Sequence, residues 1–182
     1  MTKRVPPEIK EKSRLTKEEW REYTKTVWSI ANKAHKDHPA AFPTEIPHRL
    51  TKLFSFYGET VLDPFAGTGT TAKAAIPLGR RAVCVEQNPA YVEIIQKECS
   101  VLRNGHEDDF VPLDTIHGDS RNMDAVANDS IGLVVTSPPY WDKADYGDGP
   151  DNLGNIQNYR EFLDGIRPVF EECYRVLQPG RK

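Results

Sequence analysis

Short apolar runs alternate with longer segments of helical periodicity over most of the chain. The apolar runs predict buried strands at residues 60–63, 81–86, 113–117 and 131–136. Helices are predicted at residues 70–78, 89–102, 122–127 and 156–177. This alternation predicts an α/β fold, a doubly wound and mostly parallel sheet with helices on both of its faces.

A capping box marks the first predicted helix. Thr16 is the expected N-cap residue, and Glu19, three residues later, can return a hydrogen bond to the Thr16 backbone. The helix is predicted to contain Trp20, Val27 and Trp28. We expect this aromatic and apolar stripe to pack into the core.

The chain divides into two predicted parts. Residues 1–34 form an N-terminal helical arm, and residues 35–182 form a cofactor-binding and catalytic domain. Three prolines within residues 35–47 exclude a regular helix there, so this segment is predicted to be extended. A helix at about residues 48–56 follows it. The sequence shows no recognisable target-recognition region.

Composition agrees with a globular domain, because 38% of the 182 residues are hydrophobic and 28% are charged. The net charge of −3 is uneven: residues 1–52 hold twelve Lys or Arg and seven Asp or Glu, hence +5, which leaves −8 for the rest. The basic arm suits DNA phosphates, but the solvated face of a helix is the favoured interpretation.

The three cysteines, Cys84, Cys99 and Cys173, have no C-x-x-C spacing, so no zinc or other metal site and no disulfide framework is expected. We expect them to be buried as small apolar side chains. No apolar stretch approaches the about 20 residues that span a bilayer, and the first residues lack the apolar core of a signal peptide. A cytoplasmic location is therefore expected.

A glycine loop follows the first predicted strand. The segment D-P-F-A-G-T-G-T at residues 63–70 joins this strand to a helix that begins near Thr70. Gly67 and Gly69 allow the backbone to approach a ligand closely. In doubly wound sheets ligands bind at the carboxyl ends of the strands, where Asp63 and Glu86 both lie.

Two other ligand classes are weighed against this loop. Gly67-x-Gly69-x-x-Ala72 followed by Glu86 also fits the dinucleotide fingerprint, which on its own leaves a nicotinamide cofactor open. The charge of Asp63 disfavours a pyrophosphate beside the loop and favours a positively charged ligand. A Walker loop is excluded, since no Lys-Ser or Lys-Thr follows at the required spacing.

The second motif is T-S-P-P-Y-W at residues 136–141, directly after the last predicted strand. Its two prolines fix φ near −65° and lack N–H groups, so the turn is stiff and offers carbonyl acceptors. Such a set of acceptors suits an amino group.

Together the two motifs resemble those of the S-adenosylmethionine-dependent amino-methyltransferases of DNA, the cytosine-N4 and adenine-N6 family. The resemblance covers about residues 15–180. It implies S-adenosyl-L-methionine as the cofactor, double-stranded DNA as the partner, and the DNA methylation found in restriction-modification. The implied cofactor-binding residues are Phe42, Pro43, Asp63, Phe65, Gly67, Gly69, Thr70, Glu86 and Asp119. The implied catalytic residues are Ser137, Pro138, Pro139 and Tyr140.

Specific roles follow from the resemblance and from chemistry. Asp63 is expected to face the positively charged methionine portion of the cofactor, Glu86 the ribose hydroxyls, and Asp119 the adenine amino group. An exocyclic amine is a poor nucleophile, and acceptance of its N–H bonds by the Ser137 hydroxyl and the Pro138 carbonyl would direct its lone pair at the methyl group.

The target base must be flipped out of the duplex, and the ring of Tyr140 is expected to stack on it. In the family, Ser at the position of Ser137 favours cytosine N4, and Asp or Asn favours adenine N6. Methylation of ring carbon 5 is excluded, because no Pro-Cys pair is present. An RNA or protein amide methyltransferase is a weaker alternative.

Two departures from a complete family member stand out. The chain stops at residue 182, where relatives continue into further strands of the sheet, and the order of its motifs is unusual for what precedes them. We expect a fragment, a permuted half or one half of a split enzyme, lacking C-terminal strands. A second chain would then supply those strands and target recognition. The alternative function is an inactive cofactor-binding module.

Overall fold

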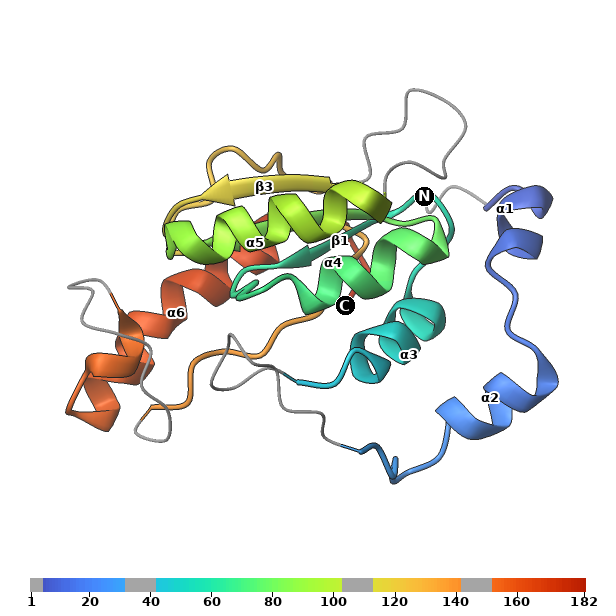
Figure 1. The fold of residues 1–182 in the computed structure, drawn as a ribbon, viewed down its shortest axis with the longest axis horizontal. Helices are drawn as coiled ribbons and strands as arrows, with labels where there is room; N and C mark the ends of the chain where they lie inside the picture. Colours follow the sequence, from blue (N-terminus) through green and yellow to red (C-terminus); the bar gives the residue numbers. More distant parts are fainter. Residues whose placement is uncertain (1–4, 32–41, 103–112, 142–151) are drawn as a thin grey trace.

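The computed structural model describes residues 5–31, 42–102, 113–141 and 152–182. Its centre is a four-stranded sheet with the order β3-β2-β1-β4, in which every neighbouring pair is parallel (Figure 1). The strands are β1 (Thr60–Asp63), β2 (Arg81–Glu86), β3 (Leu113–His117) and β4 (Leu133–Val134). The predicted α/β fold with a parallel sheet is confirmed.

Helices cover both faces of the sheet, as expected for a doubly wound fold. Figure 1 shows α4 and α5 in front of the sheet and α6 behind it. The helices are α1 (Pro7–Lys12), α2 (Lys17–Tyr23), α3 (Glu45–Phe54), α4 (Thr70–Ala75), α5 (Pro89–Ser100) and α6 (Tyr159–Val176). Short 3-10 helices, η1 (Ile76–Leu78) and η3 (Leu153–Asn155), follow α4 and precede α6.

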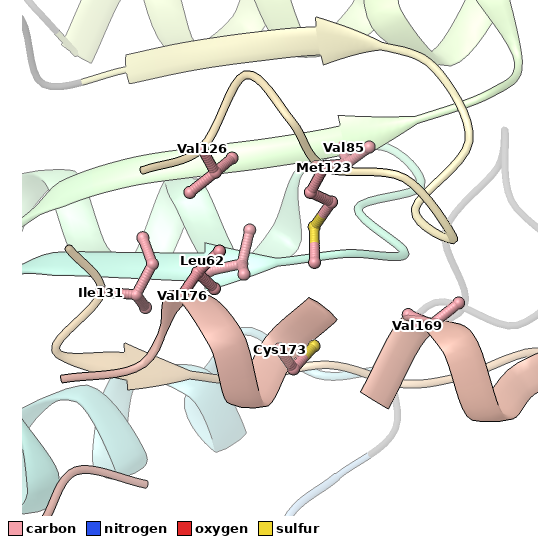
Figure 2. Packing of buried hydrophobic residues seen from close by; sticks show 8 residues of the cluster. All are labelled: Leu62, Val85, Met123, Val126, Ile131, Val169, Cys173 and Val176. Atoms are coloured by element: carbon pink, nitrogen blue, oxygen red, sulfur yellow. The ribbon is translucent and has the colours of Figure 1, made fainter. Parts of the chain in front are cut away.

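The strands alternate their side chains between two cores. Ala82 and Cys84 of β2 pack with Ile95 and Cys99 of α5 on one face of the sheet. The other face carries the cluster drawn in Figure 2, where α6 packs on β1 and β2. Its buried members are Leu62, Val85, Met123, Val126, Ile131, Val169, Cys173 and Val176. Because successive strand residues point to opposite faces, burial on both faces fixes the strand register.

Local signals set several helix ends as the sequence predicts. The Thr16 hydroxyl accepts the Glu19 N–H and the Glu19 carboxylate accepts the Thr16 N–H, so the capping box is present. Asn88 caps α5 by accepting the Ala90 N–H. Gly79 ends η1 with φ of 72°, and a Cβ there would lie 2.1 Å from the Tyr57 ring. Only glycine satisfies both constraints.

The N-terminal helix differs from the prediction. α2 ends at Tyr23, before Val27 and Trp28, because the Thr24 hydroxyl takes up the Trp20 carbonyl. Trp20 is 60% exposed and Val27 75% exposed, so the expected core stripe is wrong. Polar contacts hold α2 to α3 instead, with Glu19 paired to Lys52 and Glu22 close to Arg49. This inner face of α2 is therefore ionic.

Two further elements were placed incorrectly. The helix expected at 48–56 begins at Glu45, because Pro47 lies in its first turn, where an N–H has no helical partner. The predicted helix at 122–127 is absent and the segment forms turns. At the other end, β4 pairs over two residues rather than the six expected, and residues 177–182 run beside it through Val134 N–H to Lys182 O at 2.8 Å.

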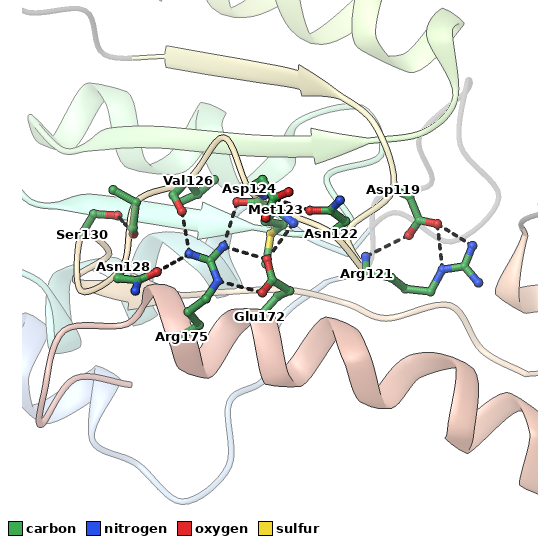
Figure 3. A network of polar contacts seen from close by, with 11 residues as sticks. Asp119, Arg121, Asn122, Met123, Asp124, Val126, Asn128, Ser130, Glu172 and Arg175 are labelled. Atoms are coloured by element: carbon green, nitrogen blue, oxygen red, sulfur yellow. Dashed lines mark hydrogen bonds and ion pairs between the residues drawn. The ribbon is translucent and has the colours of Figure 1, made fainter.

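The turns at 119–130 are held by α6 through the polar network of Figure 3. The Arg175 guanidinium donates to the carbonyl oxygens of Met123 and Val126 and to the Glu172 carboxylate. Glu172 in turn accepts the Met123 N–H at 2.7 Å. The backbone groups that a helix would pair internally are thus satisfied by α6 side chains, which explains the missing helix.

All three cysteines are free and buried, as predicted. No helix within the described ranges is both long enough and apolar enough to cross a membrane. The expected boundary between residues 34 and 35, and the expected extended segment as far as residue 41, lie outside the described residues.

Candidate functional site

A pocket of about 930 Å³, partly open to solvent, lies at the carboxyl ends of the strands. Its walls come from the loop after β1, the residues after β2 and β3, the turn after β4, and the segment before α6. The lining includes Pro64, Phe65, Ala66, Gly67, Thr68, Thr70, Glu86, Gln87, Asn88, Gly118, Asp119, Ser120, Ser137, Pro139, Asn152 and Leu153. The strand order reverses between β1 and β4, so the pocket occupies the switch point of the sheet.

Eight of the thirteen residues predicted for the site line this pocket. They are Phe42, Phe65, Gly67, Thr70, Glu86, Asp119, Ser137 and Pro139. The other five, Pro43, Asp63, Gly69, Pro138 and Tyr140, do not contribute to the lining. The structure therefore brings both sequence motifs to one cavity.

The glycine loop adopts a backbone that requires glycine. Gly67 has φ of 52° and Gly69 φ of 81°, both in the left-handed region. A Cβ on Gly69 would also approach Ile95 of α5 to 3.1 Å. Gly67 lies in the pocket lining, whereas Gly69 forms the turn into α4. The two glycines thus serve ligand approach and helix packing respectively.

Glu86 presents a fixed carboxylate to the pocket. Its two oxygens accept the Gly67 N–H at 2.7 Å and the Asn88 N–H at 2.8 Å. Burial raises the pKa of this carboxyl group, and the two backbone hydrogen bonds act against that shift. A carboxylate has about four lone-pair sites. The remaining acceptor capacity is available to a pair of ligand hydroxyls.

Asp119 is held in place by Arg121. The Arg121 N–H donates to Oδ1 at 2.8 Å and its Nε to Oδ2 at 2.7 Å. Burial acts to raise the pKa of Asp119, but these hydrogen bonds and the Arg121 charge outweigh it and lower the pKa. Next to it, the Ser120 hydroxyl donates to the Pro64 carbonyl and ties this segment to the glycine loop.

Asp63 lies beneath the glycine loop, and its side chain is only 1% exposed. Oδ1 accepts the Phe65 N–H at 3.1 Å, and Oδ2 accepts the Thr71 hydroxyl at 2.6 Å. Burial raises the pKa of Asp63 to about 6, although the Thr71 hydroxyl and the Phe65 N–H lower it. No ion pair to Asp63 occurs among the described residues. Its carboxylate therefore braces the loop from below.

The turn after β4 has one side in the pocket. Ser137 and Pro139 line the cavity, while Tyr140 is 52% exposed at its edge. Trp141 turns toward α6: its Nε1 donates to the Ile156 carbonyl at 2.7 Å, and its ring centre lies 5.2 Å from that of Tyr159. An accessible aromatic ring thus stands beside the pocket on an anchored turn.

Sequence reasoning did not select several lining residues. Gln87, Asn88 and Ser120 directly follow strand ends, and this position alone could have indicated them. Asn152 and Leu153 reach the pocket through the chain path before α6, for which the sequence carries no local signal.

Comparison with known proteins connects this geometry to a family. A model of the DNA methylase family, the N6 and N4 methyltransferases, matches residues 2–97 and 131–182. The chain belongs to this family. The match includes both motifs of the pocket, the glycine loop and the S-P-P-Y turn, and confirms the family that they predicted.

Individual family members are similar over parts of their length. The type II methyltransferase M.MjaI of Methanocaldococcus jannaschii is 40% identical over 104 residues, which cover 54% of this chain and 34% of M.MjaI. The DNA adenine methyltransferase YhdJ of Escherichia coli K12 is 37% identical over 60 residues, 33% of this chain and 20% of YhdJ. The chain thus spans about a third or less of these curated relatives.

Among solved structures, TTHA0409 of Thermus thermophilus, assigned as a DNA modification methylase, was determined in complex with S-adenosyl-L-methionine. It is 36% identical, has a TM-score of 0.50, and the match covers 64% of this chain and 43% of TTHA0409.

The buried Asp63 of this family member makes stability depend on pH. Its folded pKa of about 6 exceeds the ordinary value of 3.8, so stability is lost as the pH rises through this window. The cost above pH 7 is about 3 kcal/mol, at 1.36 kcal/mol for each pKa unit. Asp63→Asn removes the ionisation, and we expect its stability relative to wild type to rise by up to this amount between pH 4 and 7.

Urea denaturation at several pH values measures this difference. Asp164→Asn, at an exposed position on α6, is the matched control and should follow wild type throughout. Glu86 titrates in all three proteins, so its effect largely cancels. A stability difference for Asp63→Asn that stays constant with pH would contradict the raised pKa.

Proposed function

We propose that this chain binds S-adenosyl-L-methionine and transfers its methyl group to the exocyclic amine of a base flipped out of double-stranded DNA. In this proposal residues 35–182 form the cofactor-binding and catalytic domain and residues 1–34 an arm. The supporting observation is that one pocket is lined by the glycine loop, by two acidic side chains and by the S-P-P-Y turn.

The charges of the pocket support this cofactor over a dinucleotide. The lining contains Glu86 and Asp119 and no Lys or Arg among the described residues. A pyrophosphate would meet two carboxylates with no compensating side-chain cation in that lining, whereas a sulfonium ligand carries a positive charge. Phe42 and Phe65 add apolar surface for an adenine ring and a methylene chain.

Each polar group has a proposed task in holding the cofactor. Glu86 accepts hydrogen bonds from the ribose hydroxyls with the lone pairs that Gly67 and Asn88 leave available. Asp119, oriented by Arg121, accepts the adenine amino group. Gly67 and Thr70 lie where the loop backbone approaches the methionine portion. Pro43 and Gly69 shape the walls from behind, and the role first expected of Asp63 is considered below.

The S-P-P-Y turn is proposed to prepare the target amine. When bound, the cofactor supplies an electrophilic methyl group on a positively charged sulfur. The Ser137 hydroxyl and the Pro138 carbonyl accept the two N–H groups of the amine, which leaves the nitrogen lone pair directed at that methyl group. Pro139 stiffens the turn, and the exposed ring of Tyr140 stacks on the flipped base.

Cytosine N4 is the target that we propose, because Ser137 occupies the first position of the turn. Adenine N6 is the second candidate, and it is favoured by the similarity to a DNA adenine methyltransferase. We further propose that target recognition comes from additional polypeptide, in the same or a second chain, since the curated relatives are about three times longer than the matched part.

Binding of the cofactor is tested by isothermal titration calorimetry with S-adenosyl-L-methionine. We expect saturable binding by wild type and at least tenfold weaker binding by Glu86→Gln, because charge-assisted hydrogen bonds to the ribose are lost. Glu93→Gln, on the exposed side of α5, is the matched control and should bind like wild type. Equal affinities of wild type and Glu86→Gln would reject the role of this carboxylate.

Methyl transfer is tested by nucleoside mass spectrometry of DNA from methylation-deficient cells that express the chain. We expect N4-methylcytosine, reduced about 10- to 100-fold by Tyr140→Ala through lost stacking and abolished by Pro138→Ala. Tyr174→Ala, at an exposed tyrosine of α6, should not reduce it. N6-methyladenine would overturn the choice of base, and unmodified DNA would contradict catalysis by this chain.

A further inference from the structure

The carboxylate of Asp63 lies at the junction of the two sequence motifs without reaching the pocket. It holds the glycine loop through the Phe65 N–H and α4 through the Thr71 hydroxyl. The same Thr71 oxygen lies 3.3 Å from the carbonyl of Val135, at the base of the S-P-P-Y turn. The Val135 N–H in turn donates to Leu62 of β1 at 2.9 Å. Asp63 is therefore central to the junction of loop and turn.

The turn also offers Asp63 an unused donor. The Thr136 hydroxyl is buried and makes no hydrogen bond in the described part of the chain. It lies close enough to Asp63 to lower the pKa of that carboxyl group. An unpaired buried hydroxyl costs about 1–3 kcal/mol, so its persistence calls for an explanation.

Thr136 and Ser137 are adjacent in an extended segment, so their side chains point in opposite directions. Ser137 lines the pocket, and Thr136 faces the carboxylate beneath it. A ligand that draws Ser137 and Pro139 inward would move Thr136 with them. The small remaining gap between the Thr136 hydroxyl and Asp63 is the distance that such a movement would close.

We propose that Asp63 is a positioning residue, whose carboxylate accepts the Thr136 hydroxyl when the S-P-P-Y turn closes on an occupied pocket. This inference rests on the proposed binding of S-adenosyl-L-methionine. It replaces a direct contact between Asp63 and the methionine portion with an indirect one, through the turn. Asp63 thereby couples cofactor binding to the placement of the groups that hold the target amine.

The proposal separates the effect of Thr136 on stability from its effect on binding. Thr136→Val removes an unpaired buried hydroxyl, so the cofactor-free protein should melt at the same or a higher temperature. The same variant lacks the hydrogen bond that forms on closure, and its affinity for S-adenosyl-L-methionine should fall at least fivefold. A residue with a purely structural role would not weaken binding while preserving stability.

Thermal melting and calorimetry on four proteins test this prediction. Thr136→Ser retains the hydroxyl and should bind within twofold of wild type. Thr115→Val is the matched control, because Thr115 on β3 also carries a buried hydroxyl without a partner in the described residues, away from the pocket lining. It should melt like Thr136→Val and bind like wild type.

The outcomes distinguish this inference from the proposed function. Weakened binding by Thr136→Val alone supports the positioning role. Wild-type affinity in Thr136→Val would overturn the inference and leave cofactor binding intact. A wild-type chain that does not bind S-adenosyl-L-methionine would overturn the proposed function together with the inference that depends on it.

Discussion

Parallel pairing of the four strands is the constraint on which the site depends. Because β1 to β4 run in the same direction, all four carboxyl ends meet at one edge of the sheet. Glu86, Asp119 and the S-P-P-Y turn come together there although they are far apart in sequence. Burial on both faces of β1 and β2 fixes the register, so the packing in Figure 2 also holds the pocket residues in their relative positions.

Electrostatics gives this pocket its chemical character. The two carboxylates that line it are each fixed by donors from the protein, backbone N–H groups for Glu86 and Arg121 for Asp119. A third, Asp63, is buried without an ion pair in the described residues and is more costly to ionise. Such a cost is typical of functional sites, where a strained or unpaired group is retained for its role rather than for stability.

Local patterns predicted what depends on neighbours in sequence. The strands at 81–86 and 113–117 have the expected bounds, because short β-branched runs leave little alternative. The predictions failed where distant side chains decide. The segment 122–127 is not a helix because Arg175 and Glu172 satisfy its backbone (Figure 3). Trp20 is exposed because ion pairs, not apolar contacts, join α2 to α3. Asp63 was expected in the pocket, and only its contacts with Thr71 and Phe65 reveal its place beneath the loop.

The most direct test is a crystal structure of the chain with S-adenosyl-L-homocysteine, the product of the proposed reaction. The account predicts the ligand at the carboxyl ends of the strands, with its ribose hydroxyls on Glu86, its adenine amino group on Asp119 and its sulfur directed toward the S-P-P-Y turn. A ligand bound elsewhere, or bound here with Glu86 turned away from the ribose, would contradict it.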